Sequence, residues 1–228
     1  MTRAGYEVAI ADVRRLLLEM GSRVDIMIVG SIEALTQQNV ALAEKILEGD
    51  DEIDELDVRI ESKCMQLIAL QQPLARDLRV IGTAMKVITD LERIGDHAVD
   101  IAKVARKLAK DSFYKPLVDL PRMASLVRQM LHDALAAFVN HDLALIDQVV
   151  KADDLVDDLF HRVREELHAT MERQSQLVVQ ASYLLFVAHY LERMADHIVN
   201  IAERVYYVET SSLAALAKTD KAVRGQAA

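Results

Sequence analysis

Two segments of this chain, one hundred residues apart, carry the residue types best suited to chemistry. Residues 91–102 read LERIGDHAVDIA and residues 191–202 read LERMADHIVNIA, so eight of the twelve positions are identical. The repeated polar residues are Glu92 and Glu192, Arg93 and Arg193, Asp96 and Asp196, and His97 and His197. Repeated apolar positions would indicate only that two helices pack alike, whereas repeated polar positions predict a functional surface.

The carboxylates of each segment have the spacing of neighbours on a helix surface. Glu92 and Asp96 are four residues apart, so they lie one turn apart on one face, and Asp100 continues the row. The second segment repeats the arrangement with Glu192, Asp196 and Asn200. An ordinary solvated face is one explanation, but like charges at this spacing destabilise a helix, and a bound cation would offset that. Oxygen ligands suit magnesium, calcium, manganese or iron better than soft metals, so the pattern predicts metal binding. Iron, manganese, zinc or magnesium are the candidate ions.

Two further acidic pairs lie upstream of the segments. Asp50 and Asp54 are four residues apart, and Asp153 and Asp157 repeat them 103 residues later. Both pairs are expected in the first turn of a helix, where acids cap backbone N–H groups and complement the macrodipole. Capping and metal ligation are therefore equally open explanations for these four residues.

Histidine and arginine complete each signature. His97 and His197 lie between the apolar stripe and the acidic face, where hydrogen-bonding boundary residues are favoured over metal ligands. Arg93 and Arg193 are expected to pair with acids of the neighbouring helix or of a partner protein. These four residues are therefore candidates for partner binding.

Long helices are needed to position these side chains. The chain has 228 residues with only seven Gly, three Pro and 4% aromatic residues, too few turn formers for a many-stranded β fold. Apolar residues at alternating steps of four and three over 87–108 and 184–208 predict bundle helices. The repetition continues upstream at an offset of 103, which indicates a duplicated unit of about one hundred residues.

Each half is predicted to form three helices, giving an all-α fold of two tandem three-helix bundles related by a pseudo-two-fold axis. The predicted domains are residues 1–113 and 114–210, followed by a flexible tail at 211–228. Asn39 is the expected cap of a short helical continuation over 40–47, and Asn140 is taken as its equivalent. The helices are expected over 7–38, 50–70 and 75–110, and then over 121–139, 153–171 and 176–208.

The bulk properties narrow the class of function. A net charge of −9 argues against nucleic acid as a partner and permits binding of cations or basic protein surfaces. The single Cys64 fits a reducing cytoplasm, and its place on an apolar stripe predicts a buried, unreactive thiol. No signal peptide is visible, and the uncharged stretch 174–191 contains too many polar residues for a membrane span. We therefore expect a cytoplasmic protein that reaches a membrane only through a partner.

The segment 72–79, QPLARDLR, followed by the two signatures, resembles the PhoU family, and the resemblance covers about residues 6–208. It implies a non-enzymatic cytoplasmic regulator of two three-helix bundles that forms a homodimer. It implies two partners, the ATPase subunit of a phosphate ABC transporter and a phosphate sensor histidine kinase, whose starvation response the protein keeps off when phosphate is plentiful. It also implies iron or other metal clusters on E/D-x-x-x-D motifs, which fall on the four acidic pairs, with Asp50/Asp54 and Asp153/Asp157 as the facing set.

One residue and one segment depart from the expected pattern. Asn200 stands where the first signature has Asp100, so the two sites differ in charge. The stretch after Val208 lacks the Gly and His expected there, which leaves the tail without an assigned role.

Two other classes of function compete with the regulator. A di-metal bundle enzyme would need a Glu from each of two helices and two inward-facing Glu-x-x-His motifs, and the chain offers only Glu165/His168. A purely structural helical adaptor would differ from the regulator only in holding no metal.

Overall fold

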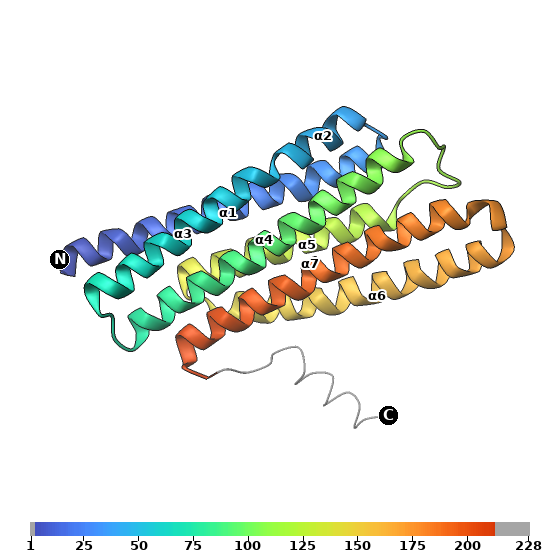
Figure 1. Cartoon of the computed structure of the whole chain (residues 1–228). Coiled ribbons are helices and arrows are strands. Elements are labelled where there is room, and N and C mark those ends of the chain that lie inside the picture. The colour runs from blue at the N-terminus through green and yellow to red at the C-terminus, as the bar shows by residue number, and fades with distance from the viewer. Residues whose placement is uncertain (1–2, 213–228) are drawn as a thin grey trace, which may run out of the picture.

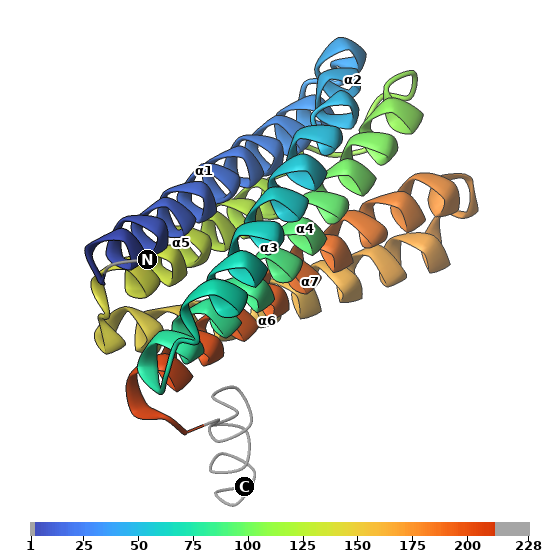
Figure 2. The ribbon, with the colours of Figure 1, turned by 60° about the vertical axis from the view of Figure 1, so that its left-hand side comes forward.

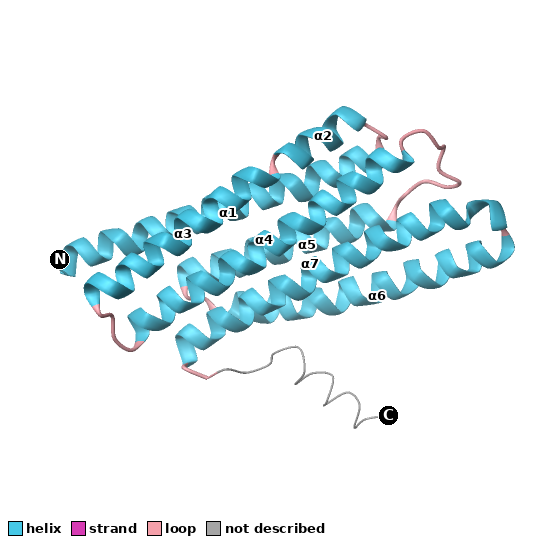
Figure 3. Cartoon of the chain, viewed as in Figure 1, coloured by secondary structure: helices cyan, strands magenta, loops and turns pink. Residues whose placement is uncertain are grey.

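The computed structural model describes residues 3–212, which form helices and their connections without any β-strand in that range (Figure 1; Figure 3). The helices are α1 (Arg3–Thr36), α2 (Val40–Glu48), α3 (Asp50–Gln71), α4 (Arg76–Leu108), α5 (Asp119–Asn140), α6 (Leu143–Arg173) and α7 (Val178–Thr210), with a 3-10 turn at Ser175–Leu177 before α7. The all-α prediction is confirmed. The predicted tail at 211–228 lies, beyond Ser212, outside the described residues.

Helices α1, α4, α5 and α7, which run alongside one another in Figure 2, join the two repeats through their mutual contacts. Helix α4 of the first repeat packs against α7 of the second about as extensively as against its own α1, and α1 also contacts α5. Helix α3 covers α1 and α4, while α6 covers α5 and α7. The buried apolar residues of both repeats form one continuous core. The two bundles therefore share a core, and their joint faces place α3, α4, α7 and α6 side by side.

Gly49 divides the second helix of the first repeat into α2 and α3, whereas the corresponding helix of the second repeat, α6, is continuous. Gly49 lies between α2 and α3, and its N–H closes α2 on two preceding carbonyl oxygens. Its equivalent, 103 residues later, is Ala152, which costs a helix about 0.8–1.0 kcal/mol less than glycine, and α6 runs uninterrupted through it. The prediction that a helix begins near Asp153 is therefore wrong, and capping does not explain Asp153 and Asp157. Asp50, by contrast, is the first residue of α3.

Helices α2 and α6 each begin with a side-chain cap. Asn39 Oδ1 accepts a hydrogen bond from the backbone N–H of Leu42 at 3.1 Å, and Asp142 Oδ1 accepts one from Ala144 at 2.9 Å. Asp142 follows Asn39 by the repeat offset of 103, whereas Asn140 is the last residue of α5. The assignment of Asn140 as the equivalent of Asn39 is therefore wrong by two residues.

We expect Asp142→Ala to lower the free energy of unfolding by about 0.5–2 kcal/mol, because the first turn of α6 would lose its acceptor. Urea unfolding followed by far-ultraviolet circular dichroism measures this change. Asn140→Ala is the matched control, since it removes a polar side chain of similar size two residues earlier, and it should leave the unfolding midpoint nearly unchanged. Equal losses in the two variants would contradict the cap assignment.

Equivalent residues of the two repeats meet each other along the pseudo-two-fold axis. Asp25 of α1 and Arg128 of α5, 103 residues apart, form a two-pronged ion pair with N–O distances of 2.7 and 3.0 Å. On α4 and α7, the rings of His97 and His197 have centroids 5.8 Å apart. A residue meets its own copy only where it lies on a two-fold axis, so these contacts mark where the axis passes.

Two smaller expectations concern single segments. None of the helices within residues 3–212 is both long and apolar enough to cross a membrane. The uncharged stretch 174–191 instead forms the turn before α7 and the first half of that helix. Cys64 is fully buried, and burial raises the pKa of its thiol to about 11, in agreement with the predicted unreactive cysteine.

Candidate metal and partner-binding surface

The first signature lies on α4, and its acids face the acidic pair of α3. Burial raises the pKa of Glu92, and the charges of Asp96 and then Asp54 raise it further. Burial likewise raises the pKa of Asp50, with additional contributions from Asp54 and Asp96. Glu92 and Asp50 thus each feel the charge of an aspartate on the other helix. We call these four residues, Asp50, Asp54, Glu92 and Asp96, the first acidic cluster.

The second signature lies on α7 and faces α6 in the same way. Burial raises the pKa of Glu192 above its usual range, the charge of Asp196 adds to it, and Asp157 of α6 contributes as well. We call Asp157, Glu192 and Asp196 the second acidic cluster. Asp153 precedes Asp157 by one turn on α6 and is only 7% exposed. In both repeats the charge of an aspartate on the neighbouring helix, Asp54 of α3 or Asp157 of α6, therefore adds to the raised pKa of the signature glutamate.

The arginines of the signatures bind acids of their own helices. Arg93 Nη1 lies 3.1 Å from Asp96 Oδ2, and Arg193 Nη2 lies 3.0 Å from Asp196 Oδ2. The expectation that they pair with the neighbouring helix is wrong for the isolated chain, because a three-residue step already brings each arginine to the following aspartate. Both arginines remain half-exposed.

Asp100 and Asn200, the last residues of the two polar rows on α4 and α7, have different hydrogen-bond partners. Asp100 accepts a hydrogen bond from Lys103 at 2.8 Å and is held on α4. Asn200 Nδ2 instead reaches Asp90 of the other repeat at 3.4 Å. A carboxylate in one row and an amide in the other give the two acidic faces different charges.

The oxygen donors fit a hard cation in kind but not in their present side-chain positions. Within residues 3–212, no three His, Cys, Asp or Glu side chains converge closely enough to hold a metal ion. The charge of Asp96 adds to the burial that raises the pKa of Glu92, and the charge of Asp196 does the same for Glu192, yet Arg93 and Arg193 form ion pairs with these two aspartates. Metal binding would therefore require these two flexible arginines to swing away and the carboxylates to turn inward.

The two signature histidines have different surroundings. His197 Nδ1 lies 2.9 Å from Asp90 Oδ1, so an N–H at this position donates to the carboxylate. His97 Nδ1 is buried without a hydrogen-bond partner in the described part of the chain, and its ring stacks on Tyr190 at 5.6 Å. The cause is the residue opposite, because the equivalent of Asp90 is Tyr190. The predicted hydrogen bond is confirmed for His197 and wrong for His97.

The motif of the enzyme alternative points to solvent. Glu165 and His168 are both exposed on α6. An inward-facing ligand pair, which a di-metal bundle enzyme needs, is not formed by these two residues.

Sequence reasoning missed a group of rings beside the second acidic cluster. Phe160 of α6 and His189 of α7 have ring centroids 6.2 Å apart, and His189 is followed by Tyr190. Phe186 stacks on Tyr190 at 6.5 Å. These rings have no counterparts in the first repeat, so a search for identical positions passes over them. The differences between the repeats carried the signal.

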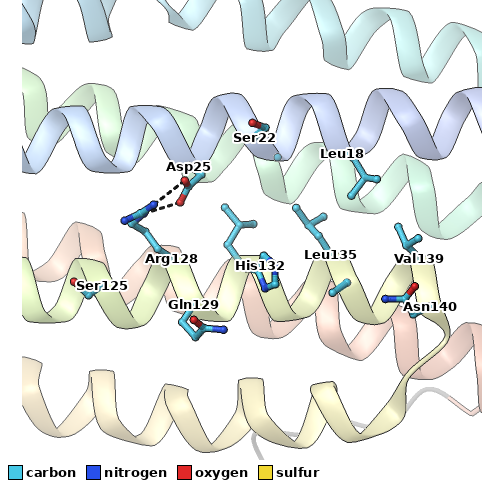
Figure 4. Close-up of a pocket in the computed structure, with 13 residues that line it drawn as sticks. Leu18, Ser22, Asp25, Ser125, Arg128, Gln129, His132, Leu135, Val139 and Asn140 are labelled. Atoms are coloured by element: carbon cyan, nitrogen blue, oxygen red, sulfur yellow. Dashed lines mark hydrogen bonds and ion pairs between the residues drawn. The ribbon is translucent and has the colours of Figure 1, made fainter.

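A cavity of about 620 Å³ opens elsewhere, between α1 and α5 (Figure 4). The Asp25–Arg128 ion pair crosses it, and Leu18, Leu135 and Val139 line its apolar part. It contains none of the predicted site residues. We therefore place the candidate surface on α3, α4, α6 and α7.

We expect Glu192→Gln to stabilise the protein, because this glutamate is held close to Asp196 with only 19% of its side chain exposed. Removing that repulsion alone is worth about 0.2–0.5 kcal/mol at neutral pH. A raised carboxyl pKa means that stability is highest while the group is protonated and falls as pH rises from the usual glutamate pKa through the folded one. Melting temperatures measured across this range should decline less for the variant than for the parent. A lower melting temperature for Glu192→Gln at neutral pH would contradict the prediction.

The sequence model of the PhoU domain family matches this chain twice, at residues 17–105 and 120–205, once in each repeat. The chain belongs to the PhoU family. A curated relative from Clostridium acetobutylicum, named a phosphate-specific transport system accessory protein PhoU homolog, is 40% identical over 92% of this chain and 96% of its own length. A homolog of the same name from Aquifex aeolicus is 39% identical over 80% of this chain and 82% of its own length.

Solved PhoU structures share the whole fold. The crystal structure of PhoU from Pseudomonas aeruginosa superposes with a TM-score of 0.87 at 32% identity, covering 91% of this chain and 100% of that one. The phosphate transport system regulatory protein PhoU from Streptococcus pneumoniae superposes with a TM-score of 0.86 at 30% identity, covering 92% of this chain and 99% of that one. The helical PhoU arrangement with an internal repeat is therefore established for this chain.

Proposed function

We propose that this protein is a non-enzymatic adaptor of phosphate homeostasis. It represses phosphate uptake and the phosphate-starvation response by docking on the ATPase subunit of a phosphate ABC transporter and on a sensor histidine kinase, at the cytoplasmic side. The observation that carries the proposal is the presence of an acidic cluster in each of the two repeats of a PhoU-family chain. The names of the curated relatives, accessory proteins of the phosphate-specific transport system, support it.

Docking would act by shifting populations. When one conformation of a partner binds the adaptor more tightly than another, the adaptor shifts the partner's equilibrium toward the tighter-binding conformation. The size of the shift is set by the difference between the two affinities. The half-exposed Arg93 and Arg193, together with the acids that they neighbour, offer charged groups for such contacts. A homodimer would present four acidic clusters in place of two.

Metal is a second part of the proposal. Asp50, Asp54, Glu92 and Asp96 would hold an ion in the first repeat, and Asp153, Asp157, Glu192 and Asp196 in the second, with Asp100 and Asn200 at the margins. Iron, manganese, zinc or magnesium would supply positive charge that offsets the repulsion between these carboxylates. The protein's own residues then set the spacing, because α3 with α4 and α6 with α7 hold the two halves of each cluster apart at fixed positions.

The test is a quadruple variant, Glu92→Gln/Asp96→Asn/Glu192→Gln/Asp196→Asn, in cells grown with ample phosphate. We expect a reporter of the starvation response to be switched on, because the docking surface loses four charges while its shape is kept. Glu33→Gln/Glu48→Gln/Asp147→Asn/Glu172→Gln is the matched control, since it removes four charges from exposed sites outside the clusters. It should leave repression intact.

The same two variants separate the roles of metal and charge. Plasma mass spectrometry of the purified proteins should find metal in the parent and in the control and less of it in the cluster variant. Repression that survives in the cluster variant would sink the adaptor proposal for this surface. Loss of repression with no metal in any of the proteins would leave the docking surface in place and favour the metal-free adaptor.

A further inference from the structure

A row of rings crosses from α6 to α4 beside the second acidic cluster. Ring centroids are separated by 6.2 Å from Phe160 to His189, by 6.4 Å from His189 to Tyr190, and by 6.5 Å from Tyr190 to Phe186. Tyr190 then stacks on His97 of α4 at 5.6 Å. We call Phe160, Phe186, His189 and Tyr190 the aromatic row.

The row places scarce aromatic residues where solvent reaches them. The chain has six Tyr, four Phe and no Trp. Phe186, at 52% exposed, is the one Phe or Tyr in residues 5–212 that is largely open to solvent. Val179 lies two helical turns earlier on the same helix and is 65% exposed. Exposed apolar side chains at a seven-residue spacing form a stripe that a second helix can cover.

The row belongs to one repeat only. By the repeat offsets, the positions equivalent to its four rings are filled by Asp57, Lys86, Thr89 and Asp90. The acidic clusters are nearly symmetric about the axis, so alone they would accept a partner in either of two orientations. Rings on one side remove that ambiguity and give the surface a single docking direction.

The charges beside the row favour a cation. His189 Nδ1 lies 3.4 Å from the buried Glu192 Oε2, and 19% of the Glu192 side chain remains exposed beside the rings. The guanidinium carbon of Arg164 already lies 5.6 Å from the ring centroid of Phe160. A ring face attracts a guanidinium, and a carboxylate can accept its N–H groups.

We propose that the aromatic row, together with Glu192, binds an arginine side chain carried by a helix of the protein partner. The inference rests on the proposed adaptor function and specifies the chemistry of the partner. The partner helix would lie along α7, cover Val179 and Phe186 with apolar residues, and place its guanidinium against the rings. Arginine suits this place better than lysine because its flat guanidinium stacks on rings.

The test uses a fluorescein-labelled amphipathic helical peptide with leucines at heptad spacing and two arginines on the flank. Two matched peptides carry citrulline, a neutral isostere, or lysine in place of arginine. Fluorescence anisotropy with the purified full chain should show the arginine peptide binding about tenfold or more tightly than the citrulline peptide, with lysine between them. No binding of the arginine peptide, or equal binding of the arginine and citrulline peptides, would overturn the proposal.

Variants assign the binding to the row. Phe186→Lys copies the equivalent Lys86 and should weaken the arginine peptide at least about tenfold, while Phe186→Tyr should retain binding. Met65→Ala, in the other repeat and equally exposed at 53%, is the control and should bind as the parent does. Unchanged binding by Phe186→Lys would also overturn the proposal.

These readouts are independent of the adaptor test. Phe186→Lys leaves every acid of the two clusters in place, so its metal content should match that of the parent. If the cluster variant keeps repression in cells while the arginine peptide still binds the row, the adaptor proposal fails and the arginine site stands. If the cluster variant loses repression and the arginine and citrulline peptides bind equally, the adaptor proposal stands and the arginine site fails.

Discussion

Replacing Leu91 or Leu191 with alanine should lower the free energy of unfolding by about 2–5 kcal/mol, because each side chain is fully buried and its loss leaves a cavity. The two leucines are equivalent positions of the signatures. For a chain of this length, each kcal/mol corresponds to a shift of the melting temperature of about 2–4 °C, so calorimetry resolves the effect easily. Leu155→Ala, at an exposed position of α6, should change it little.

The form of the transition is as informative as its midpoint. Helices α4 and α7 join the two repeats through one core, so both variants should shift a single cooperative transition. Independent repeats would instead split the melt of Leu91→Ala into two steps, with the second half unfolding at the temperature of the parent. A split melt would therefore contradict the shared core.

His197→Phe should cost about 1.5–3 kcal/mol, whereas His97→Phe should change stability by less than about 0.5 kcal/mol. His197 satisfies Asp90, a carboxylate with only 16% of its side chain exposed, and phenylalanine would leave that charge without its 2.9 Å contact. His97 has a buried nitrogen without a partner among the described residues, so a phenylalanine that stacks on Tyr190 loses little. Urea unfolding of the two variants measures the difference.

A double variant tests the cause of that difference. Asp90→Tyr/His197→Phe puts an aromatic ring opposite position 197, as Tyr190 lies opposite His97. It should recover at least half of the stability that His197→Phe loses. Equal losses for the two single variants, or no recovery in the double variant, would show that the residue at position 90 does not set the two environments apart.

The elements of this fold could be predicted because helical periodicity and duplication reinforce each other. Apolar spacing located the long helices, and the repeated acids identified the two clusters, which the structure brings together from neighbouring helices. The failures are local. The continuation of α6 through Ala152 depends on one residue that differs between the repeats. The cap at Asp142 follows Asn39 by 103 residues, and the asparagine at position 140, identical to Asn39, lies two residues before it.

Other features lay beyond what a pattern of identities can predict. The partners of Arg93 and Arg193 depend on side-chain conformations. Each arginine could pair with an aspartate three residues later on its own helix or with an acid on the next helix, and the structure shows the first. The aromatic row arises where the repeats diverge, so a comparison that records only shared residues gives it no weight. The buried nitrogen of His97 follows from the identity of a residue on the partner helix.

The Asp25–Arg128 pair says something about the ancestry of the molecule. A symmetric pair of single-repeat chains would bring the same residue to both sides of the axis, and two aspartates or two arginines there would repel. An acid can face a base at this place only where the two copies have separate codons that change independently, as they do in this chain. The ion pair is thus younger than the duplication, and the same freedom permits aspartate opposite one of the two histidines and tyrosine opposite the other.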